Sequence, residues 1–125
     1  MTGATVQLHA ALRAQANGLY ACEAAAELLI AHASWLRRDD FIDEFVHTHL
    51  GLVNGIPMAA IDWPEAISAL DSGRLPCSGG EGRILKITAS LADGAPVNLQ
   101  DTLTGLDSTN IDRVARAVRH AGGKK

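Results

Sequence analysis

The chain has 125 residues, of which 47 % are hydrophobic and 20 % charged, and its formal net charge is −3. This length is typical of one domain, and the composition excludes an intrinsically disordered chain. The longest apolar run, residues 24–33, is interrupted by Glu27 and His32 and is too short to cross a bilayer. Only 4 % of the residues are aromatic, so we expect a core of small aliphatic side chains, which favours closely packed helices.

The cysteines and the N-terminus indicate a cellular compartment. Cys22 and Cys77 are the two cysteines of the chain, and two thiols in a domain of this size do not form a disulfide framework. The N-terminus does not have the basic region and apolar run of a signal peptide. We therefore expect a cytoplasmic protein with reduced thiols and no membrane association.

The first half of the chain is predicted to form three helices and a loop. The first helix is expected to be capped by Thr5 and to end at Gly18, and the second is expected over residues 20–36. The third is predicted from residue 38 or 39 to Leu50, with Gly51 ending it, because its apolar residues recur at helical spacing. Residues 52–61 are interpreted as a loop and not as a hairpin, since only one flank has strand character.

Helix-capping signals recur through the second half. Residues 62–65 (Asp-Trp-Pro-Glu) and 78–81 (Ser-Gly-Gly-Glu) both have the spacing of a capping box. Asn98 is predicted to cap a short helix that Gly105 ends, and residue 107 or 108 to cap a last helix that reaches Gly122. These signals predict an all-α fold, a compact orthogonal bundle of about six to seven short helices. We expect one helical domain over residues 1–122 and a flexible basic tail over residues 123–125.

One segment has a misleading similarity to ABC-type ATPases. Residues 78–81 resemble the signature loop of that family, residues 97–101 stand where its Walker B strand would lie, and residues 104–107 resemble its D-loop. A nucleotide, however, needs a G-x-x-x-x-G-K-[ST] loop, which this chain does not have. Asn98 and Gln100 are also too polar for a buried parallel strand. We therefore expect no enzyme, no catalytic residue and no cofactor, and we assign these residues to helix caps.

Other residues spread along the whole chain resemble a known group of proteins. They lie in residues 25–32, 35–41, 62–63, 78–81, 89–92 and 105–107, together with Asn110. In these segments the chain is similar to an uncharacterised group of small actinobacterial proteins. The resemblance implies an independent one-domain protein of bacterial origin, and it implies no activity.

Two local patterns raise the possibility of metal or thiol chemistry. Glu44 and His47 are spaced as E-x-x-H on a predicted helix, with His49 close by, and such a pair can bind one metal ion. A metal site needs more ligands than this, so we interpret the segment as an acidic surface helix and assign no metal. Cys77 precedes a predicted helix N-terminus, where its pKa would fall and the thiol would become reactive. The alternative is that Cys77 is an unreactive, partly buried residue.

The C-terminal segment has the pattern of a DNA-binding helix pair. Residues 98–114 fit a helix-turn-helix with Gly105 in the turn, and Ile111 and Val114 would face inward on the second helix. Residues 109–125 contain five basic residues and one acidic residue, a local charge of +4. The side chains predicted to contact a partner or nucleic acid are Thr109, Asn110, Arg113, Arg116 and Arg119. Asp101, however, stands where a small residue normally lets the two helices cross.

The function expected from these patterns is a non-enzymatic one. We predict a small regulatory or accessory module that binds another protein, because capping and core packing account for nearly every informative residue. DNA binding through the C-terminal helix pair is the alternative. Pro57, Met58 and Trp63 are expected either to form an apolar docking surface or to fill the core. The sequence does not define the oligomeric state.

Overall fold

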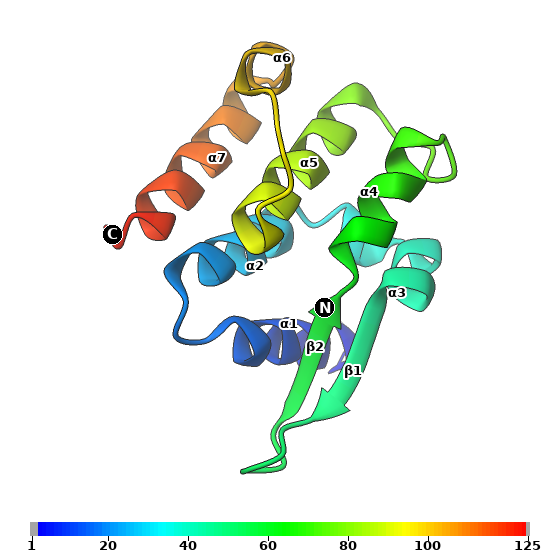
Figure 1. The fold of residues 1–125 in the computed structure, drawn as a ribbon, viewed down its shortest axis with the longest axis vertical. Coiled ribbons are helices and arrows are strands. Elements are labelled where there is room, and N and C mark those ends of the chain that lie inside the picture. The colour runs from blue at the N-terminus through cyan, green and yellow to red at the C-terminus, as the bar shows by residue number, and fades with distance from the viewer. Residues whose placement is uncertain (1–2, 125) are drawn as a thin grey trace.

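The computed structural model describes residues 3–124. Over that range the chain forms seven α-helices, one 3-10 helix and a two-stranded sheet (Figure 1), so the predicted helical bundle is confirmed. The elements in chain order are α1 (Gly3–Ala16), α2 (Tyr20–His32), η1 (Trp35–Arg37), α3 (Asp39–Phe45), β1 (Val46–Leu50), β2 (Pro57–Ile61), α4 (Trp63–Asp71), α5 (Gly79–Asp93), α6 (Leu99–Thr104) and α7 (Ser108–Ala121). None of the helices within residues 3–124 is long and apolar enough to cross a membrane.

Helices α2 and α5 form the centre of the molecule and contribute to two hydrophobic clusters. The first cluster joins them to α1, η1, α3, β2 and α4, with Leu29 of α2 and Leu85 of α5 both buried. The second joins them to α7 through Leu28 of α2, Ile84 of α5 and Val114 of α7. Each central helix therefore buries two faces, which agrees with its high content of small and aliphatic residues.

The first cluster contains three fully buried aromatic side chains, those of Trp35, Phe41 and Phe45. Their rings pack in tilted pairs, with centroids 5.3 Å apart for Trp35–Phe41 and 5.7 Å apart for Phe41–Phe45. The indole N–H of Trp35 donates to the backbone carbonyl of Glu81, 2.9 Å away. The guanidinium of Arg38 covers the outer face of the indole at 4.8 Å from its centroid. These contacts fix η1 against the start of α5.

The caps predicted in the second half of the chain are present. The side chain of Ser78 accepts from the backbone N–H of Glu81 (3.2 Å), and the Glu81 carboxylate accepts from the N–H of Ser78 (2.8 Å), which completes a capping box. The side chains of Asn98 and Asp107 cap α6 and α7 by accepting from the N–H of Asp101 and of Asn110, without the reciprocal bond of a capping box. Residues 79–93 and 99–104 are helical and residues 94–98 contain no strand, so the segment that stands where a Walker B strand would lie has no sheet counterpart.

The cap at Asp62 is only half of the predicted box. Its side chain accepts from the N–H of Glu65 at 3.3 Å. The N–H of Asp62, which Glu65 was expected to bind, instead donates to the carbonyl of Phe45 at 2.9 Å. This bond belongs to the base of a β-hairpin that the sequence did not predict.

The hairpin is the main correction to the predicted fold. Residues 46–50 form β1 and not the end of a helix, and residues 57–61 form the antiparallel strand β2, with Val46 opposite Ile61 and Leu50 opposite Pro57. Helix α3 accordingly ends at Phe45, and Gly51 lies in the hairpin loop. The prediction of a loop over residues 52–61 was correct for residues 52–56 and wrong for residues 57–61, which form β2.

Two smaller boundaries also differ from prediction. Helix α1 already includes Gly3, so Thr5 lies inside the helix and does not cap it. Helix α2 ends at His32, because Ala33 adopts a positive φ of 73° and the chain turns into η1. At the other end, the amides of Gly123 and Lys124 donate to the carbonyls of His120 and Arg119. The first two residues of the expected flexible tail are thus bonded to α7, and Lys125 lies outside the described residues.

Candidate functional site

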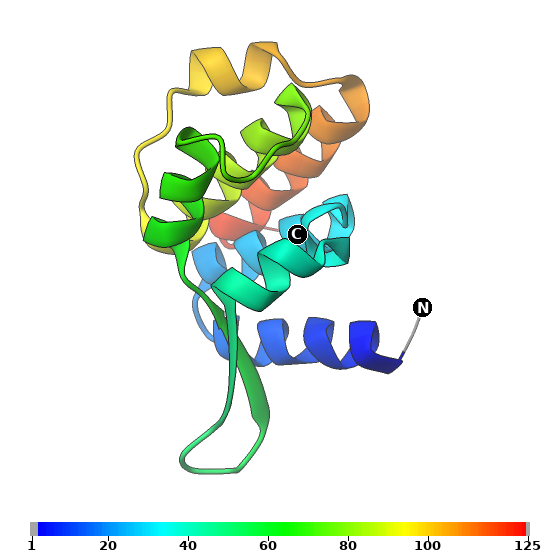
Figure 2. The ribbon, with the colours of Figure 1, turned by 90° about the vertical axis from the view of Figure 1, so that its right-hand side faces the viewer.

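The β-hairpin projects from the helical body as an arm, residues 46–61 (Figure 2). At the base of the arm, the N–H of Asp62 donates a hydrogen bond to the carbonyl of Phe45. Helix α1 also packs on β2 there, over the buried Ala59. Alanine at this position lets the helix approach the strand closely. Beyond the base, His47, Thr48 and His49 of β1 have exposed side chains.

The loop at the end of the arm has a defined conformation. The N–H of Gly51 donates to the carbonyl of Ile56 at 2.9 Å, and the side chain of Asn54 accepts from the N–H of Ile56 at 3.0 Å. Gly55 has a φ of +66°, which favours glycine. A Cβ on Gly51 would lie 2.8 Å from Oδ1 of Asn54, so glycine is needed there for close approach.

This loop presents four apolar side chains to solvent, which we call the arm tip: Leu50, Leu52, Val53 and Ile56. Leu52 and Val53 are fully exposed, and Leu50 and Ile56 are 64 % and 48 % exposed. Isolated apolar residues on a surface are ordinary, whereas contiguous exposed apolar groups are typical of interaction sites in general. Of the three expected docking residues, Pro57 is exposed on β2 opposite Leu50 and so lies beside the arm tip, Met58 is half-buried on β2, and Trp63 is buried in the core.

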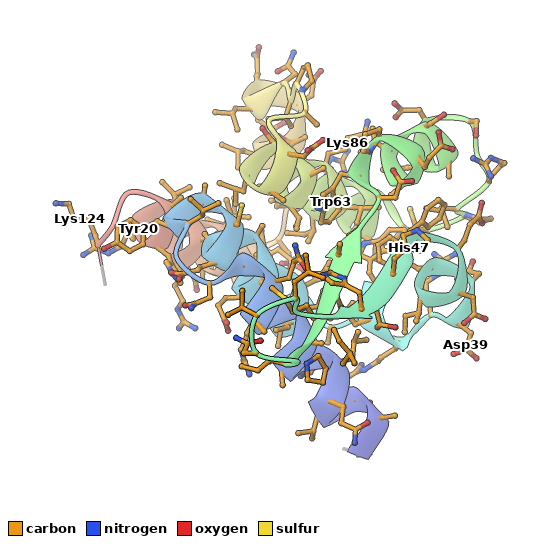
Figure 3. The ribbon with its side chains drawn as sticks, turned by 60° about the horizontal axis from the view of Figure 1, so that its bottom comes forward. Tyr20, Asp39, His47, Trp63, Lys86 and Lys124 are labelled. Atoms are coloured by element: carbon orange, nitrogen blue, oxygen red, sulfur yellow. The ribbon has the colours of Figure 1, made fainter. Side chains whose placement is uncertain are left out.

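A second surface lies where the end of α7 meets the start of α2. Seven residues line a cleft of about 530 Å³ there, which we call the C-terminal cleft: Tyr20, Glu23, Arg116, Arg119, His120, Gly123 and Lys124. Tyr20 and Lys124 lie together at one end of the molecule, on the opposite side from His47 of the arm (Figure 3). The cleft thus brings together residues about a hundred positions apart in the sequence.

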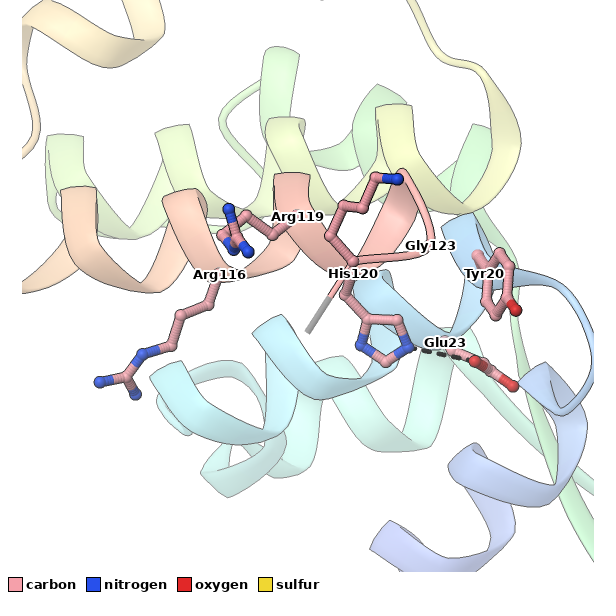
Figure 4. Close-up of a pocket in the computed structure, with 7 residues that line it drawn as sticks. Tyr20, Glu23, Arg116, Arg119, His120 and Gly123 are labelled. Carbon is pink, nitrogen blue, oxygen red and sulfur yellow. Dashed lines mark hydrogen bonds and ion pairs between the residues drawn. The ribbon is translucent and has the colours of Figure 1, made fainter.

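Glu23 is held from two sides in this cleft. One carboxylate oxygen accepts from the backbone N–H of Gly18 at 3.0 Å. The other lies 3.1 Å from Nε2 of His120 (Figure 4). Glu23 therefore links the turn before α2 to the last turn of α7.

The residues predicted to contact nucleic acid are spread along α7. Arg116 and Arg119 line the C-terminal cleft, whereas Thr109 lies at the other end of α7, about 15 Å away along the helix axis. Asn110 was expected on the exposed face but is buried, and its side chain accepts from Arg113 at 2.8 Å. Arg113 is half-buried at this contact.

Helix α7 is rotated relative to the prediction. Its buried face contains Asn110, Val114 and Ala117, whereas Ile111, expected to face inward, is exposed. The small side chain of Ala117 lets α7 pack closely against Ala24 and Leu28 of α2. The inner face of α7 is therefore set by its contact with α2, and not by a helix-turn-helix contact with α6.

Gly105 in the predicted turn also has a different role. Its φ of −95° is accessible to any residue, so the turn itself does not need glycine. A Cβ at this position would lie 2.2 Å from Cζ of Arg83. The guanidinium of Arg83 occupies this space, and it also lies against Gly79 at the start of α5.

The E-x-x-H pattern does not form a metal site. Glu44 ends up on helix α3 and His47 on strand β1, so the two do not share a helical face. Glu44 instead pairs with Arg74 at 3.0 Å, and His47 and His49 are exposed on the arm. Within residues 3–124 there is no group of three or more His, Cys, Asp or Glu side chains placed to hold a metal ion.

The structure also argues against a reactive Cys77. Burial of the sulfur and the carboxylate of Glu81 both raise the pKa of the Cys77 thiol, and they outweigh Arg38, which lowers it. Although much of the residue is exposed, its Sγ lies against Gly82, where a Cβ would be 3.4 Å away. Both cysteines are free thiols. The prediction of a lowered pKa at the helix N-terminus was wrong, first because the Cys77 sulfur is partly buried and second because the Glu81 carboxylate already occupies that terminus.

No family model, curated protein or solved structure matches this chain. The resemblance to small actinobacterial proteins therefore stays a prediction.

Proposed function

We propose that this chain is a non-enzymatic interaction module that docks on another protein through the arm tip. The observation that carries the proposal is the complete exposure of Leu52 and Val53 at the end of a projecting, structured hairpin. Glycine and asparagine build this loop so that the two apolar side chains point outward, and neither side chain contributes to the core. A bacterial cytoplasmic setting and a regulatory or accessory role are part of the proposal.

The arm offers two kinds of contact to a protein partner. The four apolar side chains of the tip fit an apolar groove, and the outer edge of β1 has main-chain groups that a strand of the partner can pair with. The exposed Thr48 and the two histidines beside it would then lie along the polar rim of the interface. We therefore commit to a protein partner that presents an apolar groove next to a strand edge.

The expected affinity follows from the size of the tip. Burial of a Leu, Ile or Val side chain contributes about 1.5–3 kcal/mol, so four contribute about 6–12 kcal/mol. Association costs about 4 kcal/mol or more. The tip alone therefore supports a complex of about micromolar affinity at best, and strand pairing along β1 would strengthen it.

The alternative of duplex DNA binding through α6 and α7 has less support. A recognition helix contacts base edges with residues near its N-terminus. In α7 that end carries Asp107 as its cap and has Asn110 buried, while the basic residues gather towards the other end. The two helices thus do not present a basic recognition surface.

The test compares the wild-type chain with the combined Leu52→Ser and Val53→Ser variant. A partner that copurifies stoichiometrically with the wild type is produced separately, and its affinity for both chains is measured by calorimetry. Removing two buried side chains should weaken binding by about 100-fold or more, since each contributes about 1.5–3 kcal/mol. Leu99→Ser is the matched control, because Leu99 is also an exposed leucine but lies on α6.

Two results would contradict the proposal. One is a partner that binds the double variant as tightly as it binds the wild type. The other is a wild-type chain that forms only a dimer with itself, which the same two substitutions abolish. Light scattering on the purified chain distinguishes this second case from binding to another protein.

A further inference from the structure

The C-terminal cleft is positively charged and lies apart from the arm. Arg116, Arg119 and Lys124 line it together with a single carboxylate, that of Glu23. Its volume of about 530 Å³ is in the range of small-ligand sites, about 300–1,000 Å³.

Helix stability does not explain all of this charge. Basic residues in the last turn of a helix favourably complement its macrodipole, and Arg119 and His120 occupy that turn in α7. Arg116 lies before the last turn and Lys124 lies beyond the helix, where this effect is small. Arg116 forms no hydrogen bond or ion pair with another residue in the described part of the chain, and its side chain extends away from the His120–Glu23 pair (Figure 4).

Tyr20 adds a flat apolar surface beside these cations. Tyr20 is 61 % exposed although it stands at the start of a helix. The backbone of Gly123 packs against one edge of the ring, since a Cβ at that position would lie 3.1 Å from Cε2 of Tyr20. Gly123 has a φ of +78°, so the turn after α7 places the backbone there. The ring is therefore held in position with much of its surface open to solvent.

A cation cluster beside an exposed aromatic ring is the arrangement that binds single-stranded nucleic acid. Lysine and arginine contact the phosphates, and the ring stacks on an unpaired base. The bases of a duplex are already stacked and paired, so a single surface tyrosine cannot stack on them. We propose that the C-terminal cleft binds a short segment of single-stranded nucleic acid, with neighbouring phosphates on Lys124 and Arg116 and a base on Tyr20.

The experiment measures fluorescence anisotropy of a short labelled oligodeoxythymidylate with the full chain, which carries any purification tag at its N-terminus. The wild type should bind the single strand and should bind a duplex of the same length more weakly. The affinity should fall with salt, by a slope of about −0.7 in log–log form for each phosphate contacted. The combined Arg116→Gln and Lys124→Gln variant should therefore lose about 1.4 from that slope.

Three further variants separate the site from general effects. Tyr20→Ala should weaken binding by about fivefold or more, since one base–aromatic stack contributes at least about that factor. Tyr20→Phe should bind as the wild type does, because the ring is kept. Arg37→Gln is the charge control, since Arg37 is an exposed arginine on η1, outside the cleft.

Competition with thymidine monophosphate distinguishes a strand from a free nucleotide as the ligand. Thymidine monophosphate should displace the labelled strand less well than the unlabelled oligonucleotide does, and equal displacement by the two would overturn the proposal. The proposal is overturned if the oligonucleotide does not bind saturably. It is also overturned if the double variant or Tyr20→Ala binds like the wild type. The Leu52→Ser and Val53→Ser variant should bind the oligonucleotide normally, so failure of this proposal is distinguishable from failure of the arm.

Discussion

Substitution of Gly105 by alanine tests why a glycine stands between α6 and α7. If Gly105 had a backbone conformation that only glycine adopts readily, an alanine there would be strained regardless of which side chains surround it. The φ of −95° at Gly105 rules out such strain. The structure instead places Arg83 where the new methyl group would go, with Cζ 2.2 Å and Nε 2.3 Å from the ideal Cβ position.

The magnitude follows from two opposing effects. Overpacking costs about 1–3 kcal/mol, and the low end applies here because a guanidinium at the end of a flexible side chain can move. Replacing glycine by alanine at a compatible position stabilises by about 0.4–1 kcal/mol through the unfolded state. Gly105→Ala should therefore destabilise the wild type by up to about 1.5 kcal/mol, and should stabilise an Arg83→Ala background by about 0.4–1 kcal/mol.

The assay is urea unfolding of the four proteins of this double-mutant cycle, followed by far-UV circular dichroism. The expected coupling free energy is about 1–2 kcal/mol, well above the deviation of about 0.3–0.5 kcal/mol that independent sites show. A cost of Gly105→Ala that is the same with and without the Arg83 side chain would refute the reasoning. It would mean that the turn itself needs glycine.

Two further predictions concern the start of α5 and the end of α2. Ser78→Ala removes the side-chain half of the capping box with Glu81 and should lower the free energy of unfolding by about 1 kcal/mol, as measured by urea unfolding. His32 has its pKa lowered, mainly by burial and also by Arg113, and its Nδ1 is buried without a hydrogen-bond partner in the described structure. The unfolded chain therefore binds a proton more readily, so stability should fall as pH drops below about 6.5. His32→Leu should flatten this part of the pH–stability profile, whereas the exposed His47→Gln should leave it unchanged.

Helix boundaries were predictable where a side chain satisfies the backbone locally. The caps at Ser78, Asn98 and Asp107 each involve a donor three residues along the chain, so sequence spacing alone identifies them. The cap at Asp62 was predictable for the same reason. The absence of the second bond of this capping box was not predictable. The N–H of Asp62 donates instead to the carbonyl of Phe45, which the hairpin brings close.

The hairpin could not be predicted from the hydrophobic pattern, because the apolar residues within residues 39–50 recur at the spacing typical of a helix. One signal was present: Val46 and Thr48 are β-branched and alternate with histidines, as in a half-exposed strand. The partner strand has the opposite tendency, since it begins with proline and contains two alanines. It becomes a strand because α1 packs on it over Ala59, a tertiary contact that local sequence does not encode.

The surfaces were predictable only in part. The excess of positive charge near the C-terminus indicated Arg116 and Arg119, but Tyr20 joins them only through the packing of α7 on α2. The orientation of α7 depends on the same packing, which is why Asn110 was expected to be exposed and is buried. The arm tip needed the hairpin to be recognised first, since four apolar residues in a loop give no sign that they project from the body.

Hydrogen–deuterium exchange of the chain, alone and with its protein partner, tests the central claim most directly. Binding of the partner should slow exchange of the backbone amides of residues 47–56, in β1 and the arm loop, while exchange at the C-terminal cleft stays the same. The amide of Leu52 is the most informative one, because its side chain is fully exposed in the free chain. Slower exchange confined to α6 and α7, with the arm unchanged, would show that the partner does not dock on the arm.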